Sequence, residues 1–240
     1  MKQLVLDIRP DAAPTLDNFV VGANAELLAA LRALAGDGGR SRAHAGVSSP
    51  VSPGVFHHYL WGPGDSGRTH LLRATIAEAA ATGRPTCYVE AANVGDALPQ
   101  TPHLLLAVDD VERLQPDAQV ALFNAFNRAR GLGHTLLLAG AAAPLQLALR
   151  EDLRTRIGQS LIFELRGLDD ETRAAILTTL ARRRGLPLSD EVTEFLLRHG
   201  RRDLPSLLAV LDALDAASLE RKRAVTLPLL REMMQAGLVI

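Results

Sequence analysis

Residues 62–69 have the spacing of a phosphate-binding loop. They read Gly-Pro-Gly-Asp-Ser-Gly-Arg-Thr, which fits G-x-x-x-x-G followed by a basic residue and then Ser or Thr. The glycines would let backbone N–H groups turn inward around phosphate oxygens, and a helix starting at Arg68 would direct its positive end at them. Thr69 is placed to hold Mg²⁺. The spacing therefore predicts phosphate binding, with a purely structural turn as the alternative.

The basic position of this loop holds Arg68, where the usual pattern has lysine. A planar guanidinium can still hold phosphate, but its reach and its charge distribution differ from those of an ammonium group. Nucleotide binding is therefore better supported than nucleotide hydrolysis. The candidate nucleotide contacts from the loop and the residue after it are Gly62, Pro63, Gly64, Asp65, Ser66, Gly67, Arg68, Thr69 and His70.

Paired carboxylates end the apolar run 104–108. A strand of this kind, downstream of a phosphate loop, would bring Asp109 near Mg²⁺ and Asp110 to the place of a water-activating acid. Acids at buried strand ends also serve as helix caps, which is the structural alternative. The phosphate loop upstream favours the nucleotide site.

Other site chemistries lack the necessary spacing. The segment 64–68 lacks the second glycine that a G-x-S-x-G nucleophile elbow requires. The seven histidines form no H-x-x-x-H pair and have no cysteine partner in zinc spacing. Cys87 is the single cysteine, so an internal disulfide framework is excluded and a reducing compartment is expected.

Apolar strands alternate with helical segments in the first two thirds of the chain, which predicts a parallel sheet covered on both faces. The expected strands are 57–61, 85–90, 103–108, 134–139 and 160–165, and the expected helices are 24–34, 68–81 and 116–130. After residue 167 the strand signals stop, and Asp169 and Ser189 can cap two of four further helices. The predicted organisation is an extended tail over 1–18, an α/β domain over 19–166 and a helical domain over 167–240. No role is assigned to the Gly-, Ser-, Arg- and Pro-rich stretch 36–54.

Composition limits the function classes. The 240 residues carry a formal charge of −1, which argues against a strongly basic nucleic-acid binder. The first ten residues lack the apolar stretch of a signal peptide, and no apolar run reaches the roughly 18 residues of a membrane span. We therefore expect a soluble cytoplasmic protein with no membrane partner.

The order of these elements resembles an AAA+ nucleotide-binding module, in which a P-loop parallel sheet flanked by helices is followed by a small all-helical lid. Residues 16–24, Leu-Asp-Asn-Phe-Val-Val-Gly-Ala-Asn, resemble the stretch before the AAA+ core of the replication initiator DnaA. The resemblance spans nearly the whole chain, and no DNA-binding helix-turn-helix domain is expected after the lid. The chain is thus most similar to the regulatory members of the DnaA-related AAA+ family.

This resemblance implies roles for several weaker segments. It implies ADP or ATP with Mg²⁺ between the two domains, with Val20, Val21 and the sensor 2 arginine Arg202 as further nucleotide contacts. It also implies that Arg156, in a segment following a short helix, points at the nucleotide of a neighbouring subunit, where an arginine offsets charge on the transferred phosphoryl group. Solvated surface arginines are the alternative for Arg156 and Arg202.

The tail Gln3, Leu4, Val5 and Leu6 resembles the short motif by which such proteins dock on the DNA polymerase sliding clamp. Two leucines on an extended tail can fill an apolar pocket while Gln3 hydrogen-bonds at its edge; an edge strand is the alternative. The implied function is stimulation of ATP hydrolysis by DnaA at the clamp, which associates the protein with the bacterial nucleoid and represses initiation. Direct sequence-specific DNA binding is not expected, and a homo-oligomer is compatible with the family.

The chain departs from the AAA+ pattern at residues 140–143, Gly-Ala-Ala-Ala, where many members supply a polar sensor to the attacking water. Together with Arg68, this departure predicts weak self-hydrolysis. An autonomous AAA+ ATPase of helicase-loader type is the alternative function, and a small-molecule phosphotransferase ranks last because no acceptor site is apparent.

Overall fold

The computed structural model describes residues 13–36, 57–64, 66–200, 204–221 and 223–236. The chain divides into two compact units, Met1–Arg166 and Gly167–Ile240, which we call the first and second units. In the part of the chain that the structure describes, no helix has both the length and the apolar composition needed to cross a bilayer.

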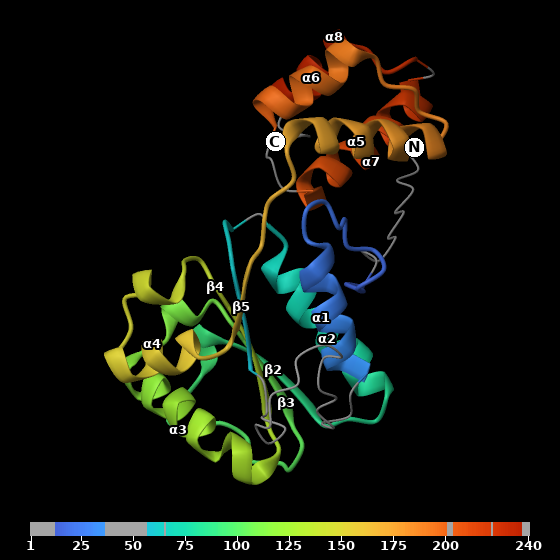
Figure 1. Cartoon of the computed structure of the whole chain (residues 1–240). Coiled ribbons are helices and arrows are strands. Elements are labelled where there is room, and N and C mark those ends of the chain that lie inside the picture. The colour runs from blue at the N-terminus through green and yellow to red at the C-terminus, as the bar shows by residue number, and fades with distance from the viewer. Residues whose placement is uncertain (1–12, 37–56, 65, 201–203, 222, 237–240) are drawn as a thin grey trace, which may run out of the picture. The chain divides into compact units, whose positions relative to one another are not determined.

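The first unit is built on a five-stranded parallel sheet (Figure 1). The order across the sheet is β2-β3-β4-β1-β5, so β1 lies between two strands that are distant from it in sequence. Parallel neighbours need long crossover connections, and helices supply most of them. The strands are β1 (His58–Trp61), β2 (Thr86–Glu90), β3 (Leu105–Asp109), β4 (Thr135–Gly140) and β5 (Leu161–Glu164).

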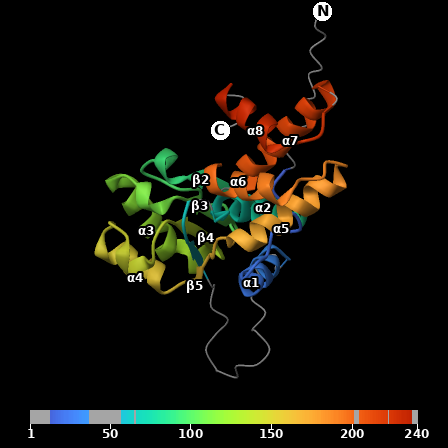
Figure 2. The same ribbon diagram turned by 90° about the horizontal axis from the view of Figure 1, so that it is seen from above.

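Helices cover both faces of this sheet, as the two views in Figures 1 and 2 show. One face packs against α1 (Ala25–Gly36) and α2 (Arg68–Ala81), and the other against α3 (Pro116–Leu132) and α4 (Glu151–Gly158). Short 3₁₀ helices follow three of the strands: η1 (Ala91–Asn93), η2 (Val111–Arg113) and η3 (Pro144–Gln146).

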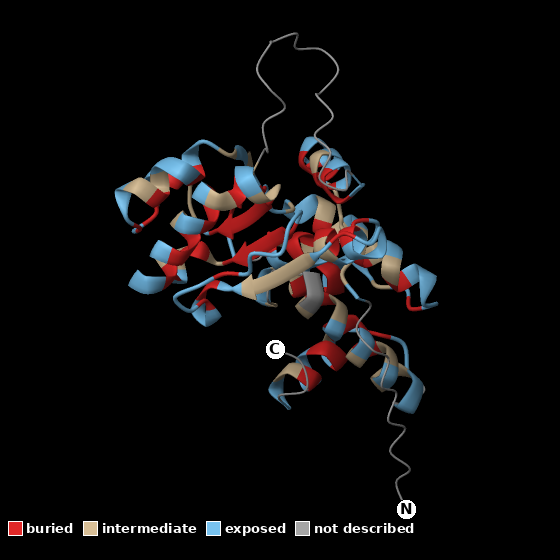
Figure 3. Ribbon diagram, turned by 90° about the horizontal axis from the view of Figure 1, so that it is seen from below, coloured by how far each residue is buried: buried red, intermediate tan, exposed pale blue. Residues whose placement is uncertain are grey.

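The sheet separates two apolar cores because successive side chains of a strand point to opposite faces. Tyr59 packs into the core under α3 and α4, and its neighbour Leu60 packs into the core under α1 and α2. Every residue of β3 and β4 is buried (Figure 3). Burial on both faces accounts for the uninterrupted apolar runs 105–108 and 136–139 within these strands.

The predicted parallel sheet with helices on both faces is confirmed, with two local differences. The strand expected from residue 103 begins at Leu105, because His103 has a positive φ of 60° and is not extended. The expected extended tail also ends early. Thr15 and Asn18 exchange hydrogen bonds of 3.0 and 3.1 Å in a turn that buries Leu16 to 2% exposure.

The second unit is helical, and its first two helices begin at the caps that the sequence predicts. The Asp169 carboxylate accepts a hydrogen bond from the Thr172 N–H at 2.7 Å, and the Ser189 hydroxyl accepts one from the Val192 N–H at 3.4 Å. Each cap satisfies an N–H group that has no partner within the helix. The helices are α5 (Asp170–Arg183), α6 (Asp190–His199), α7 (Leu204–Arg221) and α8 (Leu227–Gln235).

A buried arginine joins three segments at the amino-terminal edge of the sheet. Arg84, which is 6% exposed, donates to the Leu34 carbonyl at 3.0 Å and to the His103 carbonyl at 3.3 Å. It also donates to the Thr135 hydroxyl at 2.8 Å. Pairing of this kind offsets the cost of burying the guanidinium, and it joins the end of α1 to the starts of β3 and β4.

His57 lies near the same edge in an environment that favours its neutral form. Its Nδ1 accepts a hydrogen bond from the Leu136 N–H at 3.1 Å, and its ring meets the Phe126 ring edge-on at 5.0 Å. Burial, and then the nearby His58 and His134, lower the pKa of His57 from 6.5 to about 4. Protonation of His57 therefore opposes folding.

We expect the free energy of unfolding to fall on acidification through the window between pH 6.5 and about 4. There the unfolded chain takes up a proton at His57 that the folded chain does not, and the loss from pH 7 to pH 5 is about 2 kcal/mol. Urea unfolding at a series of pH values measures it. In His57→Asn, whose amide oxygen can still accept from Leu136, the decline should be shallower by that amount. An equally steep decline would contradict this assignment.

Candidate functional site

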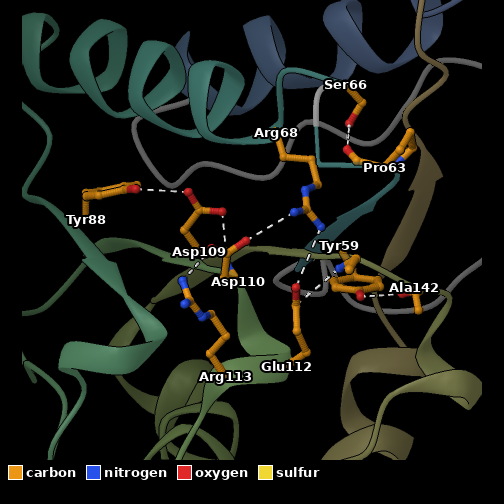
Figure 4. A network of polar contacts seen from close by, with 11 residues as sticks. Tyr59, Pro63, Ser66, Arg68, Tyr88, Asp109, Asp110, Glu112, Arg113 and Ala142 are labelled. Carbon is orange, nitrogen blue, oxygen red and sulfur yellow. Dashed lines mark hydrogen bonds and ion pairs between the residues drawn. The ribbon is translucent and has the colours of Figure 1, made fainter. Parts of the chain in front are cut away.

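The polar residues singled out by the sequence meet at the carboxyl edge of the sheet, where β1, β3 and β4 end (Figure 4). All strands are parallel, so their carboxyl ends share this edge, and ligands of open α/β sheets bind there. The loop 62–67 follows β1. Asp109 is the last residue of β3, and Asp110 comes directly after it. Two predicted sets of residues, the loop and the paired acids, are thus brought together.

The loop after β1 requires glycine at two positions. A Cβ at Gly62 would collide with the Leu165 carbonyl oxygen. Gly67 has φ 92°, and a Cβ there would lie 2.9 Å from the ring of Phe19. Between them, the N–H and hydroxyl of Ser66 donate to the Pro63 carbonyl at 3.1 and 2.7 Å.

Arg68, the first residue of α2, is buried, with its side chain only 8% exposed. Its Nη2 donates to the Asp110 Oδ1 at 3.1 Å, and its Nη1 lies 3.9 Å from the Glu112 Oε1. Nη1 is buried and makes no hydrogen bond to the described residues. Such a donor is costly to bury, which makes it suited to an anion.

Asp109 and Asp110 are held in different ways. The carboxylate of Asp109, 2% exposed as a residue, accepts from the Tyr88 hydroxyl at 2.9 Å and from the Asp110 N–H at 3.0 Å. Asp110 has φ 51°, a left-handed conformation that Asp tolerates better than most residues. Its carboxylate pairs with Arg68 and lies 3.7 Å from the Arg113 Nη1.

Two residues that sequence reasoning did not single out complete this edge. The Glu112 Oε2 accepts from the Ala141 N–H at 3.2 Å, and the Tyr59 hydroxyl donates to the Ala142 carbonyl at 2.6 Å. Residues 140–143 carry no polar side chain of their own, yet Glu112 brings a carboxylate to them from the end of β3. The spacing of Glu112 two residues after the paired acids was the available signal.

The segment before α1 lies beside the loop, because the Phe19 ring occupies the place where a Cβ of residue 67 would lie, and this ring is 5.8 Å from that of His70. Val20 and Val21 follow it and are half-buried. Asn24, 4% exposed, donates to the Arg166 carbonyl and accepts from the Arg166 N–H, both at 2.9 Å. No role was assigned to Asn24 from the sequence, since a lone asparagine gives no sign of so distant a partner.

Arg156 lies inside α4, whereas the sequence predicted a segment following a helix. It is exposed, its Nη2 donates to the Asn127 Oδ1 at 2.9 Å, and its guanidinium lies 5.8 Å from the centre of the Phe123 ring. Both contacts are on α3, so the helix pair directs this guanidinium. Arg154, on the same helix, is half-buried.

Several predicted site residues lie outside the described part of the chain: Asp65 in the loop, the lid arginine Arg202, and the tail Gln3, Leu4, Val5 and Leu6. Their assignments stay predictions.

The residues present fit a nucleotide phosphate with Mg²⁺. Arg68, at the start of α2, offers a buried N–H that has no hydrogen-bond acceptor among the described residues, and the N-terminus of a helix favours an anion. The carboxylate of Asp109 and the hydroxyl of Thr69, which is an exposed residue, are oxygen ligands of the kind Mg²⁺ prefers. No group of three or more His, Cys, Asp or Glu among the described residues is arranged to hold a metal, so water and phosphate oxygens would supply the other ligands of Mg²⁺.

Comparisons with known proteins give the family. Residues 170–234 match the family model described as "Hda, lid domain". An uncharacterized protein of Haemophilus influenzae is 34% identical over 244 residues, which cover 97% of this chain and 98% of that protein. The chain belongs to the Hda-like, DnaA-homologous AAA+ family. The predicted AAA+ fold with a helical lid is therefore confirmed.

Solved structures agree with this Hda-like fold. Domain III of Thermotoga maritima DnaA superposes with a TM-score of 0.72 at 20% identity, covering 94% of this chain and 97% of that one. AMPPCP-bound DnaA from Aquifex aeolicus gives a TM-score of 0.64 at 22% identity, covering 88% and 70%. At such identities the likeness concerns the fold.

We expect Gly62→Ala to destabilise the first unit by about 1–3 kcal/mol, because the added methyl group must displace backbone at the end of β5. Gly64→Ala is the matched control, since a Cβ there would meet no atom within 4 Å. Urea unfolding of both variants and the parent measures the difference. Equal stabilities of the two variants would show that the close approach of Gly62 to Leu165 is not a constraint.

Proposed function

We propose that this chain is a nucleotide-bound AAA+ regulator of replication initiation. It binds ADP or ATP with Mg²⁺, docks on the sliding clamp of DNA polymerase and stimulates ATP hydrolysis by the initiator DnaA. The observation that carries this proposal is the match of residues 170–234 to the lid of Hda, in a chain whose first unit has the DnaA-type AAA+ fold.

Nucleotide binding is supported by the carboxyl edge of the sheet. The loop needs glycine at Gly62 and Gly67, the start of α2 faces it, and Arg68 supplies a buried cationic donor. Helix N-termini and inward backbone N–H groups favour phosphate. The nucleotide-bound state of the Aquifex aeolicus DnaA structure is in keeping with this site.

The stimulation of DnaA is assigned to Arg156. Its exposed guanidinium is oriented by Asn127 and Phe123, so a partner surface that covers α4 would meet a preset cation. An arginine delivered in trans stabilises negative charge on the transferred phosphoryl group. Within its own chain Arg156 contacts α3, which fits an action on a neighbour.

Docking on the clamp is assigned to residues 3–6, Gln-Leu-Val-Leu, from their sequence alone. Extended peptides of this chemistry bind by placing alternate apolar side chains in pockets. Contact with the clamp would bring the protein to DNA in the bacterial cytoplasm without sequence-specific DNA binding of its own, and self-association remains compatible with this function.

An autonomous ATPase of helicase-loader type is the second candidate, and Asp109 and Asp110 favour it. The ion pairs of Asp110 with Arg68 and Arg113 count against it, because guanidinium groups there offset the negative charge that a water-activating carboxylate would use. Steady ATP turnover by the isolated protein, abolished by Asp110→Asn, would favour this candidate over the DnaA regulator.

We expect Arg156→Ala to lose the stimulation of DnaA, so that DnaA-bound ATP is hydrolysed at the rate of DnaA alone. Arginines supplied in trans contribute about 10³–10⁵ in rate in other nucleotide hydrolases. The measurement is hydrolysis of DnaA-bound ATP in the presence of clamp loaded on DNA. Arg154→Ala, which removes a guanidinium from the same helix, is the matched control and should retain stimulation. Full stimulation by Arg156→Ala would refute the assignment.

A further inference from the structure

Glu112 connects three parts of the carboxyl edge that the sequence did not relate. It lies in η2, after β3, with its side chain 28% exposed. Its Oε2 accepts from the Ala141 N–H beyond β4, and its Oε1 faces the Nη1 of Arg68 on α2 at 3.9 Å (Figure 4). Because both carboxylate oxygens of Glu112 have partners, the side chain has little freedom to move away from Arg68.

The guanidinium of Arg68 is consequently shared between two carboxylates. The Asp110 carboxylate accepts a hydrogen bond from Nη2 at 3.1 Å, and the Glu112 carboxylate lies 3.9 Å from Nη1. Each terminal nitrogen of Arg68 therefore faces a negative charge. Arg68 is also the basic residue of the phosphate loop. A phosphate that draws on Nη1 must do so against the attraction of Glu112.

The local charge balance adds to this competition. Among the described residues that these contacts link, three carboxylates, from Asp109, Asp110 and Glu112, accompany two guanidinium groups, from Arg68 and Arg113, so the network has one more negative group than positive groups. A phosphate brings further negative charge to a partly buried place, where screening by water is weaker than at the surface.

We propose that Glu112 sets the nucleotide affinity of the site by competing with the phosphate for Arg68. This inference rests on the proposed binding of a nucleotide at the loop. Glu112 acts through Arg68 and is a positioning residue. Its carboxylate lowers the affinity, and it does so most where no divalent cation offsets the charge of the phosphates.

The test is binding of a fluorescent ADP analogue to the full chain, in Mg²⁺ and in EDTA. Glu112→Gln keeps the shape and the acceptor for Ala141 but removes the charge. We expect it to bind about three- to tenfold more tightly than the parent, with the larger gain in EDTA. Glu151→Gln, at the exposed start of α4, removes one negative charge elsewhere and should bind as the parent does.

The outcomes separate this inference from the function on which it rests. A parent chain without measurable affinity for the analogue would refute nucleotide binding itself. If the parent binds the analogue and Glu112→Gln binds it equally or more weakly, the role of Glu112 is overturned while nucleotide binding stands. If Glu151→Gln gains as much affinity as Glu112→Gln, the effect comes from the net charge of the chain, and the specific role of Glu112 is likewise overturned. Should Glu112→Gln not fold, Glu112→Asp is the second variant, because its side chain is shorter by one methylene and places the carboxylate farther from the Arg68 guanidinium. It should then bind more tightly than the parent, and failure to do so would overturn the proposal.

Discussion

Parallel pairing of all five strands is the constraint on which the candidate site depends. It sends every strand in one direction, so the residues after β1, β3 and β4 meet at one edge although they are up to 80 positions apart. Backbone groups beyond the last ladder bonds have no strand partner there, and side chains must supply one. Glu112 and Tyr59 do so for the turn after β4, and Gly62 lets the turn after β1 approach Leu165.

Electrostatics then shapes the edge that the backbone has assembled. Arg68 is too buried to be solvated, so it must be paired, and Asp110 turns back to it through a left-handed backbone. Asp109 is held instead by neutral donors, the Tyr88 hydroxyl and a backbone N–H. The two adjacent carboxylates therefore have different partners, since Asp110 pairs directly with a guanidinium and Asp109 accepts from a hydroxyl and a backbone N–H, which suits them to different tasks.

Local patterns in the sequence predicted what depends on near neighbours. The apolar runs identified the strands, Asp169 and Ser189 identified helix starts, and glycine spacing identified the loop. Contacts between distant segments were missed, because Asn24, Glu112 and Asn127 are ordinary polar residues until the fold brings their partners to them. Residues 15–18 were misjudged for the same reason, since Leu16 becomes buried only against helices that follow it.

The bonding of Arg84 has a consequence for how the first unit assembles. Three of its acceptors, among the described residues, belong to Leu34, His103 and Thr135, so they come together only when α1, β3 and β4 are all in place. An intermediate that lacks one of these segments leaves a buried donor of Arg84 without its acceptor, which costs about 1–3 kcal/mol. The arginine thus penalises partial structures and makes folding of this unit more nearly all-or-none.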